Sequence, residues 1–290
     1  MKELQGESTV FAPAKVNLHL KVLDKRPDGF HNLESVFLAL NFGDTLHFEP
    51  LKALESAEIA MEGVNLPSIP IQDNIIYKAL ALFRQKTGFS LGFKITVEKR
   101  IPLGGGLGGG SSNAASTLLA LNKLTGEPLN KETLLEMAAV LGSDVPFFIH
   151  QTTSALVSGR GEQIQAIEMP QMYLTLVNPG FRSDTAAAFR LLDENRRQHE
   201  AKIHSPLSFQ AGSWRNFTND FLSIFPEKEK NAYNGIILRL KELGAVYANL
   251  SGTGSTCFGV FEDKEKAQKA AEAMRDKWDF SVNCAANLFF

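Results

Sequence analysis

The chain has 290 residues, of which 44% are hydrophobic and 21% charged, and its formal net charge is −2. This composition is typical of a globular protein with a sizeable core, and the balanced charge argues against nucleic acid as a partner. The two cysteines, Cys257 and Cys284, do not make a disulfide framework and predict a protein of the reducing cytoplasm. No apolar run has the length of a membrane span, so we expect no membrane partner.

The first half of the chain predicts strands followed by helices. Alternating apolar residues indicate strands, a 3.6-residue period indicates helices, and glycine or proline clusters indicate turns. The predicted order is a strand over 8–26, a turn at 27–29, two strands within 33–50 separated by a turn at Gly43–Asp44, a helix over 74–88, a strand over 93–102, helices over 111–126 and 130–142, and a hairpin over 154–167.

The second half predicts the order β-α-loop-α-β-β-α-β, which is close to a split βαβ arrangement. We place a domain boundary between residues 167 and 168, giving domains 1–167 and 168–290. The predicted segments are a strand over 172–180, a helix over 183–195, an irregular stretch over 204–221, a helix over 234–244, strands over 245–250 and 255–261, a helix over 264–277 and a strand over 280–288.

The segment 102–115, PLGGGLGGGSSNAA, has six glycines in seven positions. A GxGxxG dinucleotide fingerprint occurs within it, but the following helix leads to a second helix and not to a parallel strand. A Walker P-loop fails as well, because Ser111 stands where its lysine is required. A flexible linker is disfavoured by the apolar strand and helix on either side. Backbone N–H groups of such a loop, with the following helix N-terminus, predict a different phosphate cradle.

This segment resembles the glycine motif of the GHMP kinase superfamily, and two further stretches, APAKVNLHL over 12–20 and NLSGTGSTCFGVF over 249–261, match that superfamily in order. Within it, PAKVNLHLKVLDKRPDGFHNLES and LGSDVPFFI resemble the kinases of 4-diphosphocytidyl-2-C-methyl-D-erythritol, with looser matches at SDTAAAF and NDF. The resemblance implies an α+β, two-domain GHMP kinase fold, with an N-terminal ribosomal-S5-domain-2-like domain and a C-terminal ferredoxin-like split βαβ domain. It also implies ATP and Mg²⁺ as cofactors. The residues it assigns to ATP are Pro102, Leu103, Gly104, Gly105, Gly106, Leu107, Gly108, Gly109, Gly110, Ser111 and Ser112.

The resemblance assigns the phosphoryl-transfer chemistry to Asp144 and Lys15. Asp144 would deprotonate or orient the acceptor hydroxyl, although an aspartate after Gly142 also fits a helix N-cap. Lys15 shares a strand face with Asn17, which we expect to hydrogen-bond nearby as a substrate-binding residue. The resemblance places Lys15 beside the aspartate, where a cation favours the ionised forms. No metal ligands can be assigned from the sequence.

The resemblance assigns recognition of a cytosine to an aromatic and a histidine, here Phe30 and His31, although the family usually has tyrosine at the first of these positions. Phe189 matches the second aromatic of a stacking sandwich, but its helical spacing fits a core residue equally well. Thr185 is a further substrate-binding residue or a helix cap. Lys99 is assigned to ATP; with Ile75 and Ile76 it fits an adenine pocket, and element packing explains the three as well.

The sequence therefore predicts an ATP-dependent kinase of a small-molecule substrate, a cytidine-diphosphate-linked methylerythritol, acting as a monomer or homodimer. Two alternatives stay open. One is another small-molecule kinase of the superfamily, of the homoserine or mevalonate type. The other is a non-catalytic nucleotide-binding protein with the same fold.

Overall fold

The computed structural model describes residues 7–54, 56–63, 69–199, 216–278 and 280–286. Its contacts divide the chain into two compact units, each built from segments that are discontinuous in sequence. Unit 1 consists of Met1–Ala14, Phe42–Ile101 and Gly108–Gln151, and unit 2 of Lys15–Asn41, Pro102–Leu107 and Thr152–Phe290. The domains 1–167 and 168–290 stay a prediction.

Two long strands begin the fold, β1 (Ser8–Lys25) and β2 (His31–Leu54). β1 confirms the first predicted strand, but the predicted turn at Gly43–Asp44 is wrong, because β2 runs through it without interruption. A Cβ built on Gly43 would lie 2.3 Å from the carbonyl oxygen of Ala12. The glycine therefore permits a close approach of β1 to β2, which local turn propensity does not reveal.

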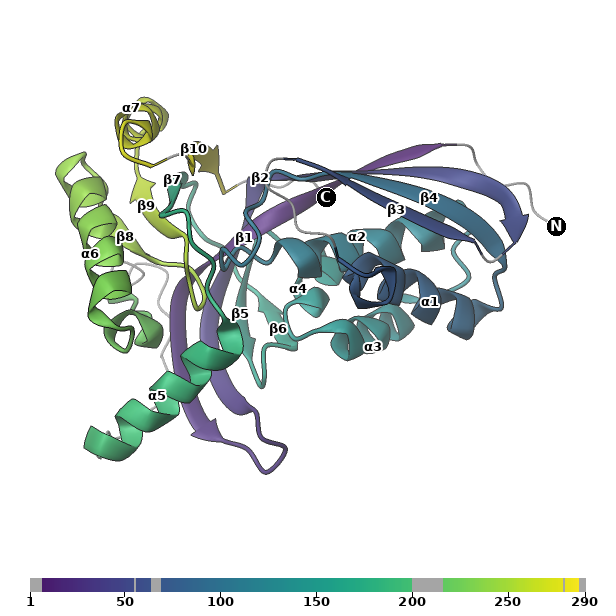
Figure 1. Ribbon diagram of the computed structural model, residues 1–290, viewed down its shortest axis with the longest axis horizontal. Helices are drawn as coiled ribbons and strands as arrows, with labels where there is room; N and C mark the ends of the chain where they lie inside the picture. Colours follow the sequence, from purple (N-terminus) through teal and green to yellow (C-terminus); the bar gives the residue numbers. More distant parts are fainter. Residues whose placement is uncertain (1–6, 55, 64–68, 200–215, 279, 287–290) are drawn as a thin grey trace. The chain divides into compact units, whose positions relative to one another are not determined.

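Unit 1 is a mixed sheet with helices on one side of it (Figure 1). β4 (Leu91–Glu98) pairs antiparallel with β2 and parallel with β3 (Ala57–Glu62), a strand that the sequence did not predict. Helix α1 confirms the predicted helix over 74–88, with Asn74 as its N-cap and Gly88 as its C-cap. The helices are α1 (Ile75–Thr87), α2 (Gly109–Leu124), α3 (Lys131–Leu141) and α4 (Val145–His150), preceded by a short 3₁₀ turn, η1 (Ile71–Asp73).

Unit 2 confirms the predicted hairpin and, among the described residues, the order of the helices and strands, β-α-α-β-β-α-β. The hairpin β5 (Ser154–Ser158) and β6 (Gln163–Ala166) extends the sheet at β2. A second sheet is antiparallel, with the order β10-β7-β9-β8. Its elements are β7 (Tyr173–Asn178), α5 (Thr185–His199), η3 (Asp220–Ser223), α6 (Glu227–Glu242), β8 (Tyr247–Leu250), β9 (Cys257–Phe261), α7 (Lys264–Arg275) and β10 (Phe280–Ala285).

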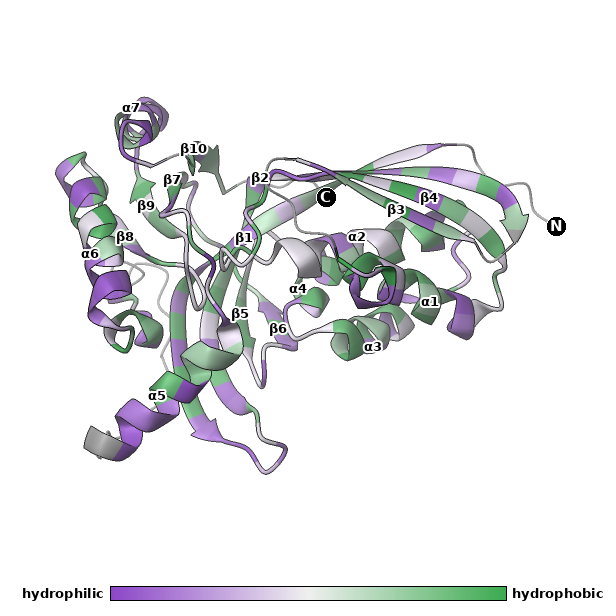
Figure 2. Ribbon diagram, viewed as in Figure 1, coloured by the Kyte–Doolittle hydropathy of each residue, from purple (hydrophilic) through white to green (hydrophobic). Residues whose placement is uncertain are grey.

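Helices α6 and α7 pack on this second sheet and share one core with it, which includes Phe221, Tyr233 and Met274. Helix α5 is hydrophobic near its start and hydrophilic toward its end (Figure 2). Within the described part of the chain, no helix is both long and apolar enough to cross a bilayer.

Some predicted boundaries differ from the structure. Helix α6 begins at Glu227, about two turns before the predicted start and directly after Pro226. The sequence missed α4, whose six residues are too few for a periodic pattern. The predicted residues 204–215 and 287–288 lie outside the described residues.

Candidate active site

Three motifs that are far apart in the sequence meet within unit 2. The backbone N–H of Lys15 donates to the carbonyl of Leu107 at 2.9 Å. The Ser251 hydroxyl accepts from the backbone N–H of Asn17 at 3.2 Å and donates to the carbonyl of Gly106 at 2.9 Å. The Thr256 N–H donates to Gly105 at 3.1 Å. The start of the chain, the glycine segment and the 251–256 loop thus form one hydrogen-bonded junction.

At this junction the side chains of Lys15 and Asn17 are both buried. The Lys15 ammonium donates to Asn17 Oδ1 at 2.6 Å, and Asn17 Nδ2 donates to Ser35 Oγ at 2.9 Å. The ammonium also lies 4.2 Å from the ring centre of Phe37, within cation–π range. These contacts fix the position of a positive charge beside the glycine segment.

Asp144 occupies the N-cap position of α4, as one interpretation of the sequence expects. Its side chain, however, makes no capping hydrogen bond, and a proline follows within the first turn of the helix. The carboxylate is half-buried. Capping therefore does not account for Asp144, and its proximity to Lys15 stays a prediction.

The glycine segment has two kinds of glycine. At Gly106, φ is +73°, and an added Cβ would lie 2.2 Å from the carbonyl oxygen of Ser251, so the glycine is required by packing against the 251–256 loop. At Gly110, in the first turn of α2, the nearest atom to an added Cβ is Ile75 Cγ2 at 3.9 Å. Packing therefore requires a glycine at position 106, whereas at position 110 there is space for a side chain or a ligand.

Two polar atoms near the start of α2 lack a hydrogen-bonding partner among the described residues. They are Ser112 Oγ and Asn113 Oδ1, and both residues are buried. An unpaired buried polar atom costs about 1–3 kcal/mol. With the free backbone N–H groups of a helix N-terminus, these atoms fit a polar or anionic ligand at this position.

We predict opposite outcomes for alanine at these two glycines. Gly106→Ala places a Cβ against the Ser251 carbonyl and should destabilise the fold by at least about 1–3 kcal/mol, the cost of a strained backbone conformation. Gly110→Ala should leave the melting temperature unchanged or raise it, because alanine favours a helix, yet weaken ATP binding. Thermal denaturation and calorimetric ATP titration measure the two effects. Equal melting temperatures together with equal ATP affinities would contradict this division of roles.

Lys99, which was assigned to ATP, makes a buried ion pair with Asp44 in unit 1. Burial lowers the pKa of Lys99, and the charge of Asp44 opposes this effect. Asp44 Oδ1 also accepts the backbone N–H groups of Arg100 and Ile101, each at 2.8 Å. The pair therefore fixes the chain where it enters the glycine segment, and the assignment of Lys99 to ATP stays a prediction.

The residues expected at the adenine differ in exposure. Ile76 is part of the core, whereas Ile75 is partly buried and is the nearest neighbour of the open position at Gly110.

The residues assigned to the cytosine lie around the β1–β2 hairpin and α5. Phe30 is 51% exposed at the hairpin tip, with the Arg160 guanidinium 5.0 Å from its ring centre. His31 is buried and stacks on Phe189, with ring centres 5.3 Å apart and planes 21° apart. Phe189 also packs edge-on against Phe221 in the core at 4.9 Å. The structure thus brings His31 and Phe189 together, and within its described part no ring contact joins Phe30 to Phe189.

Helix α5 begins next to the 251–256 loop. Asp184 caps the helix by accepting the Ala187 N–H, so the cap is not Thr185. The Thr185 hydroxyl instead lies 3.2 Å from the Thr253 hydroxyl. Thr185 therefore lies beside the junction described above.

Sequence reasoning missed several polar residues around these positions. Ser251 carried a signal, since it opens a glycine-rich loop. Asp193, 2.8 Å from His31 Nε2, and Arg160 carried none, because an acidic residue within a helix and a basic residue in a turn are ordinary surface features.

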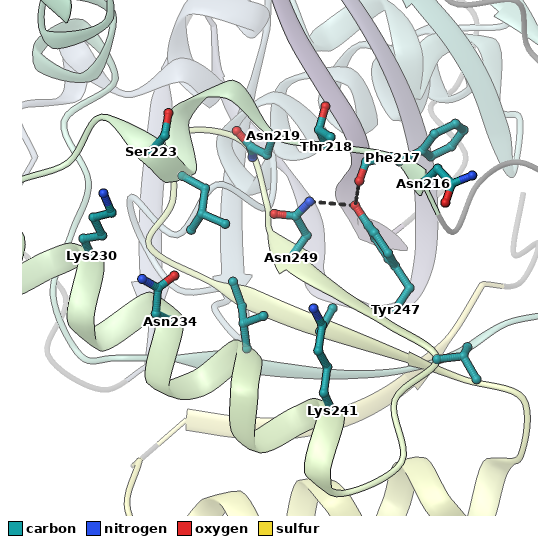
Figure 3. Close-up of a pocket in the computed structure, with 14 residues that line it drawn as sticks. Asn216, Phe217, Thr218, Asn219, Ser223, Lys230, Asn234, Lys241, Tyr247 and Asn249 are labelled. Carbon is teal, nitrogen blue, oxygen red and sulfur yellow. Dashed lines mark hydrogen bonds between the residues drawn. The ribbon is translucent and has the colours of Figure 1, made fainter.

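A separate cavity of about 630 Å³ lies in unit 2 beside α6, η3 and β8 (Figure 3). Lys230, Asn234 and Lys241 line it from one face of α6. Opposite them, Asn249 Nδ2 donates to the Tyr247 hydroxyl at 2.7 Å. None of the predicted site residues lines this cavity, so it is distinct from the candidate active site.

Comparison with known proteins tests the kinase prediction. Residues 74–152 match the family described as GHMP kinases N terminal domain, and residues 226–279 match GHMP kinases C terminal. A 4-diphosphocytidyl-2-C-methyl-D-erythritol kinase of Xanthomonas oryzae pv. oryzae is 38% identical, over 89% of this chain and 84% of that protein. Another, of Chloroherpeton thalassium, is 37% identical, over 94% of this chain and 96% of that protein. The chain belongs to the 4-diphosphocytidyl-2-C-methyl-D-erythritol kinase family.

Solved structures agree with membership of this kinase family. A crystal structure of a 4-(cytidine 5'-diphospho)-2C-methyl-D-erythritol kinase superposes with a TM-score of 0.79 at 30% identity, covering 96% of this chain and 98% of that one. A homoserine kinase from Cytophaga hutchinsonii, 18% identical, has a TM-score of 0.68 over 99% of this chain and 96% of that one, which shows the common fold. The predicted α+β, two-domain GHMP kinase fold is confirmed, and the protein is an ATP-dependent small-molecule kinase of this family.

Proposed function

We propose that the protein transfers the γ-phosphoryl group of ATP to the 2-hydroxyl of 4-diphosphocytidyl-2-C-methyl-D-erythritol, a step of the methylerythritol phosphate route to isoprenoid precursors. The observation that carries this proposal is the junction in unit 2. There the Lys15–Asn17 pair, the glycine segment and the 251–256 loop are joined by hydrogen bonds. The relatives named above act, by their names, on the same substrate.

In the proposed reaction the substrate oxygen forms a bond to the γ-phosphorus, and the bond from that phosphorus to the β–γ bridging oxygen breaks, releasing ADP. The Asp144 carboxylate orients the hydroxyl and accepts its proton. Lys15 stabilises the negative charge that develops on the oxygen. Little covalent work falls to the protein, because phosphoryl transfer depends mainly on positioning and charge stabilisation.

The residues near the start of α2 fit the phosphates of ATP. Gly110 leaves space beside the backbone, and Ser112 Oγ lacks a partner among the described residues. When bound, Mg²⁺ supplies neutralising charge to the β- and γ-phosphates. Among the described residues, no group of three or more His, Cys, Asp or Glu side chains is placed to hold a metal ion. Phosphate oxygens and the serine hydroxyls are therefore the ligands we propose.

The proposal includes a reducing cytoplasmic setting and either a monomer or a homodimer. Cys257 and Cys284 are both buried and free, which suits a compartment that keeps thiols reduced.

The direct test is ADP release with Mg²⁺-ATP and 4-diphosphocytidyl-2-C-methyl-D-erythritol, measured against a reaction without acceptor. Turnover with this substrate, and none with mevalonate, homoserine or galactose, supports the proposal. ATP binding without turnover of the cytidine compound would overturn the substrate assignment.

Alanine at Phe30 tests cytosine recognition separately. Base–aromatic stacking contributes about 1–3 kcal/mol, so Phe30→Ala should raise the KM for the cytidine substrate by roughly tenfold or more and leave the KM for ATP unchanged. Phe30→Tyr, which restores the family's usual residue, is the matched control and should retain the wild-type KM. An unchanged substrate KM in Phe30→Ala would remove this residue from the site.

A further inference from the structure

The His31 ring, at the start of β2, is held by two side chains of helix α5. Phe189 and Asp193 are four residues apart, so they lie on one face of α5. Phe189 stacks on the face of the imidazole, and Asp193 Oδ1 lies 2.8 Å from its Nε2 atom at the edge. Phe189 is itself fixed by its edge-on contact with Phe221. The stack sets the plane of the imidazole, and the carboxylate sets its rotation within that plane.

The hydrogen bond also determines which ring nitrogen carries the proton. An ionised carboxylate can only accept, so Nε2 donates to Asp193. Burial favours a neutral Asp193, but hydrogen bonds from Lys25 and His31, together with the charge of Lys25, lower the pKa of this carboxyl overall, which keeps it ionised. In a neutral imidazole with hydrogen on Nε2, the Nδ1 atom is an acceptor. Among the described residues, Nδ1 of His31 has no hydrogen-bonding partner.

There is open space next to this pair for a ligand. His31 and Asp193 line a cavity of about 380 Å³, with Lys25, Arg196 and Arg197 also on its wall. This volume is within the range of small-molecule pockets. A ligand with a negatively charged group is favoured there, because the wall carries three cationic side chains and one carboxylate.

We infer that Asp193 is a positioning residue for base selection: it fixes His31 as the Nε2–H tautomer, so that Nδ1 accepts the exocyclic amine of cytosine. Uracil has a carbonyl oxygen at the corresponding position, and two acceptors cannot pair. This inference rests on the proposed function, because it assigns a role in reading the base of that substrate.

A purely structural role for Asp193 gives a different expectation. Contacts that do not involve Asp193 also join α5 to the hairpin: the Arg196 guanidinium donates to the Leu23 carbonyl at 3.1 Å and to the Val22 carbonyl. If Asp193 only joined α5 to the hairpin, its loss would lower the stability of the fold without changing the preference for cytosine over uracil. Selectivity between bases therefore separates the two roles.

The test compares kcat/KM for the cytidine substrate and for its uridine counterpart in wild type, Asp193→Ala, Asp193→Asn and Asp220→Ala. We expect Asp193→Ala to lose tenfold or more of the cytidine preference, through KM and not kcat. Asp193→Asn should fall between it and wild type, because its amide can accept from Nε2 or donate to it. Asp220→Ala removes a carboxylate that joins α5 to β1 through Arg196 and the Val22 N–H, leaves the Asp193–His31 hydrogen bond in place and should keep the wild-type preference. An unchanged preference in Asp193→Ala, or an equal loss in Asp220→Ala, would overturn the inference.

Nitrogen-15 NMR of the histidine ring gives a readout that needs no turnover. The wild type should show His31 with hydrogen on Nε2, and Asp193→Asn should show a mixture of tautomers. If the cytidine compound is not a substrate, the proposed function fails, but this spectrum still tests the positioning role. The same single tautomer in both proteins would contradict it.

Discussion

Replacing Asp144 by asparagine is expected to lower kcat by about 10²-fold or more, the usual size of a general-base contribution. The amide has the shape of the carboxylate but cannot take the hydroxyl proton. The fold should be retained, because Asp144 makes no capping hydrogen bond to α4 that could be lost. ADP release with Mg²⁺-ATP and the cytidine substrate measures kcat, and thermal denaturation checks the fold.

The matched control for this variant is Asp263→Asn. Asp263 is also a helix N-cap, and it accepts the Lys266 N–H at the start of α7. Asparagine caps helices as well as aspartate does, so both stability and kcat should stay near wild type. If Asp144→Asn retained most of the wild-type kcat with a normal melting temperature, the carboxylate would have no role in the proton transfer.

Asp44→Asn should destabilise the protein by about 3–5 kcal/mol, the usual cost of removing one partner of a buried ion pair. The Asp44 side chain is fully buried, and that of Lys99 is 5% exposed. The substitution leaves the ammonium without its counter-charge, and one amide oxygen has to serve three donors. We expect a fall in melting temperature on the order of 10 °C, measured by calorimetry or circular dichroism.

Glu49→Gln is the matched control, since it removes a carboxylate from an ion pair of the same unit. Glu49 and Lys94 are 42% and 40% exposed, and their atoms are 3.3 Å apart. Exposed pairs contribute about 0–1 kcal/mol, so the melting temperature should hardly change. Adding Lys99→Met to Asp44→Asn removes the stranded charge and should recover part of the loss. Equal falls in melting temperature for Asp44→Asn and Glu49→Gln would show that burial does not determine how much the Lys99–Asp44 pair contributes to stability.

The sequence alone determined the local elements and the presence of three motifs. Helix α1 could be predicted because Asn74 and Gly88 are strong end signals and its apolar period is regular. The order of elements in the second half was also readable, since each element has its own period and turn residues. Short or unpatterned elements were not: α4 has six residues, and β3 alternates only weakly with polar neighbours.

Only the tertiary structure decided which residues act together. Asn17 and Ser251 are 234 positions apart, and His31 and Asp193 are 162 positions apart. No local pattern carries such pairings, because they arise from how strands and helices pack. Gly43 makes the same point: it read as a turn, but it lies inside β2 where the Ala12 carbonyl approaches. The sequence predicted that Lys99 contacts ATP, and in the structure its buried ammonium forms an ion pair with Asp44. The motifs, through their resemblance to the kinase family, thus predicted the chemistry, whereas burial and long-range hydrogen bonds determined the partner of each group.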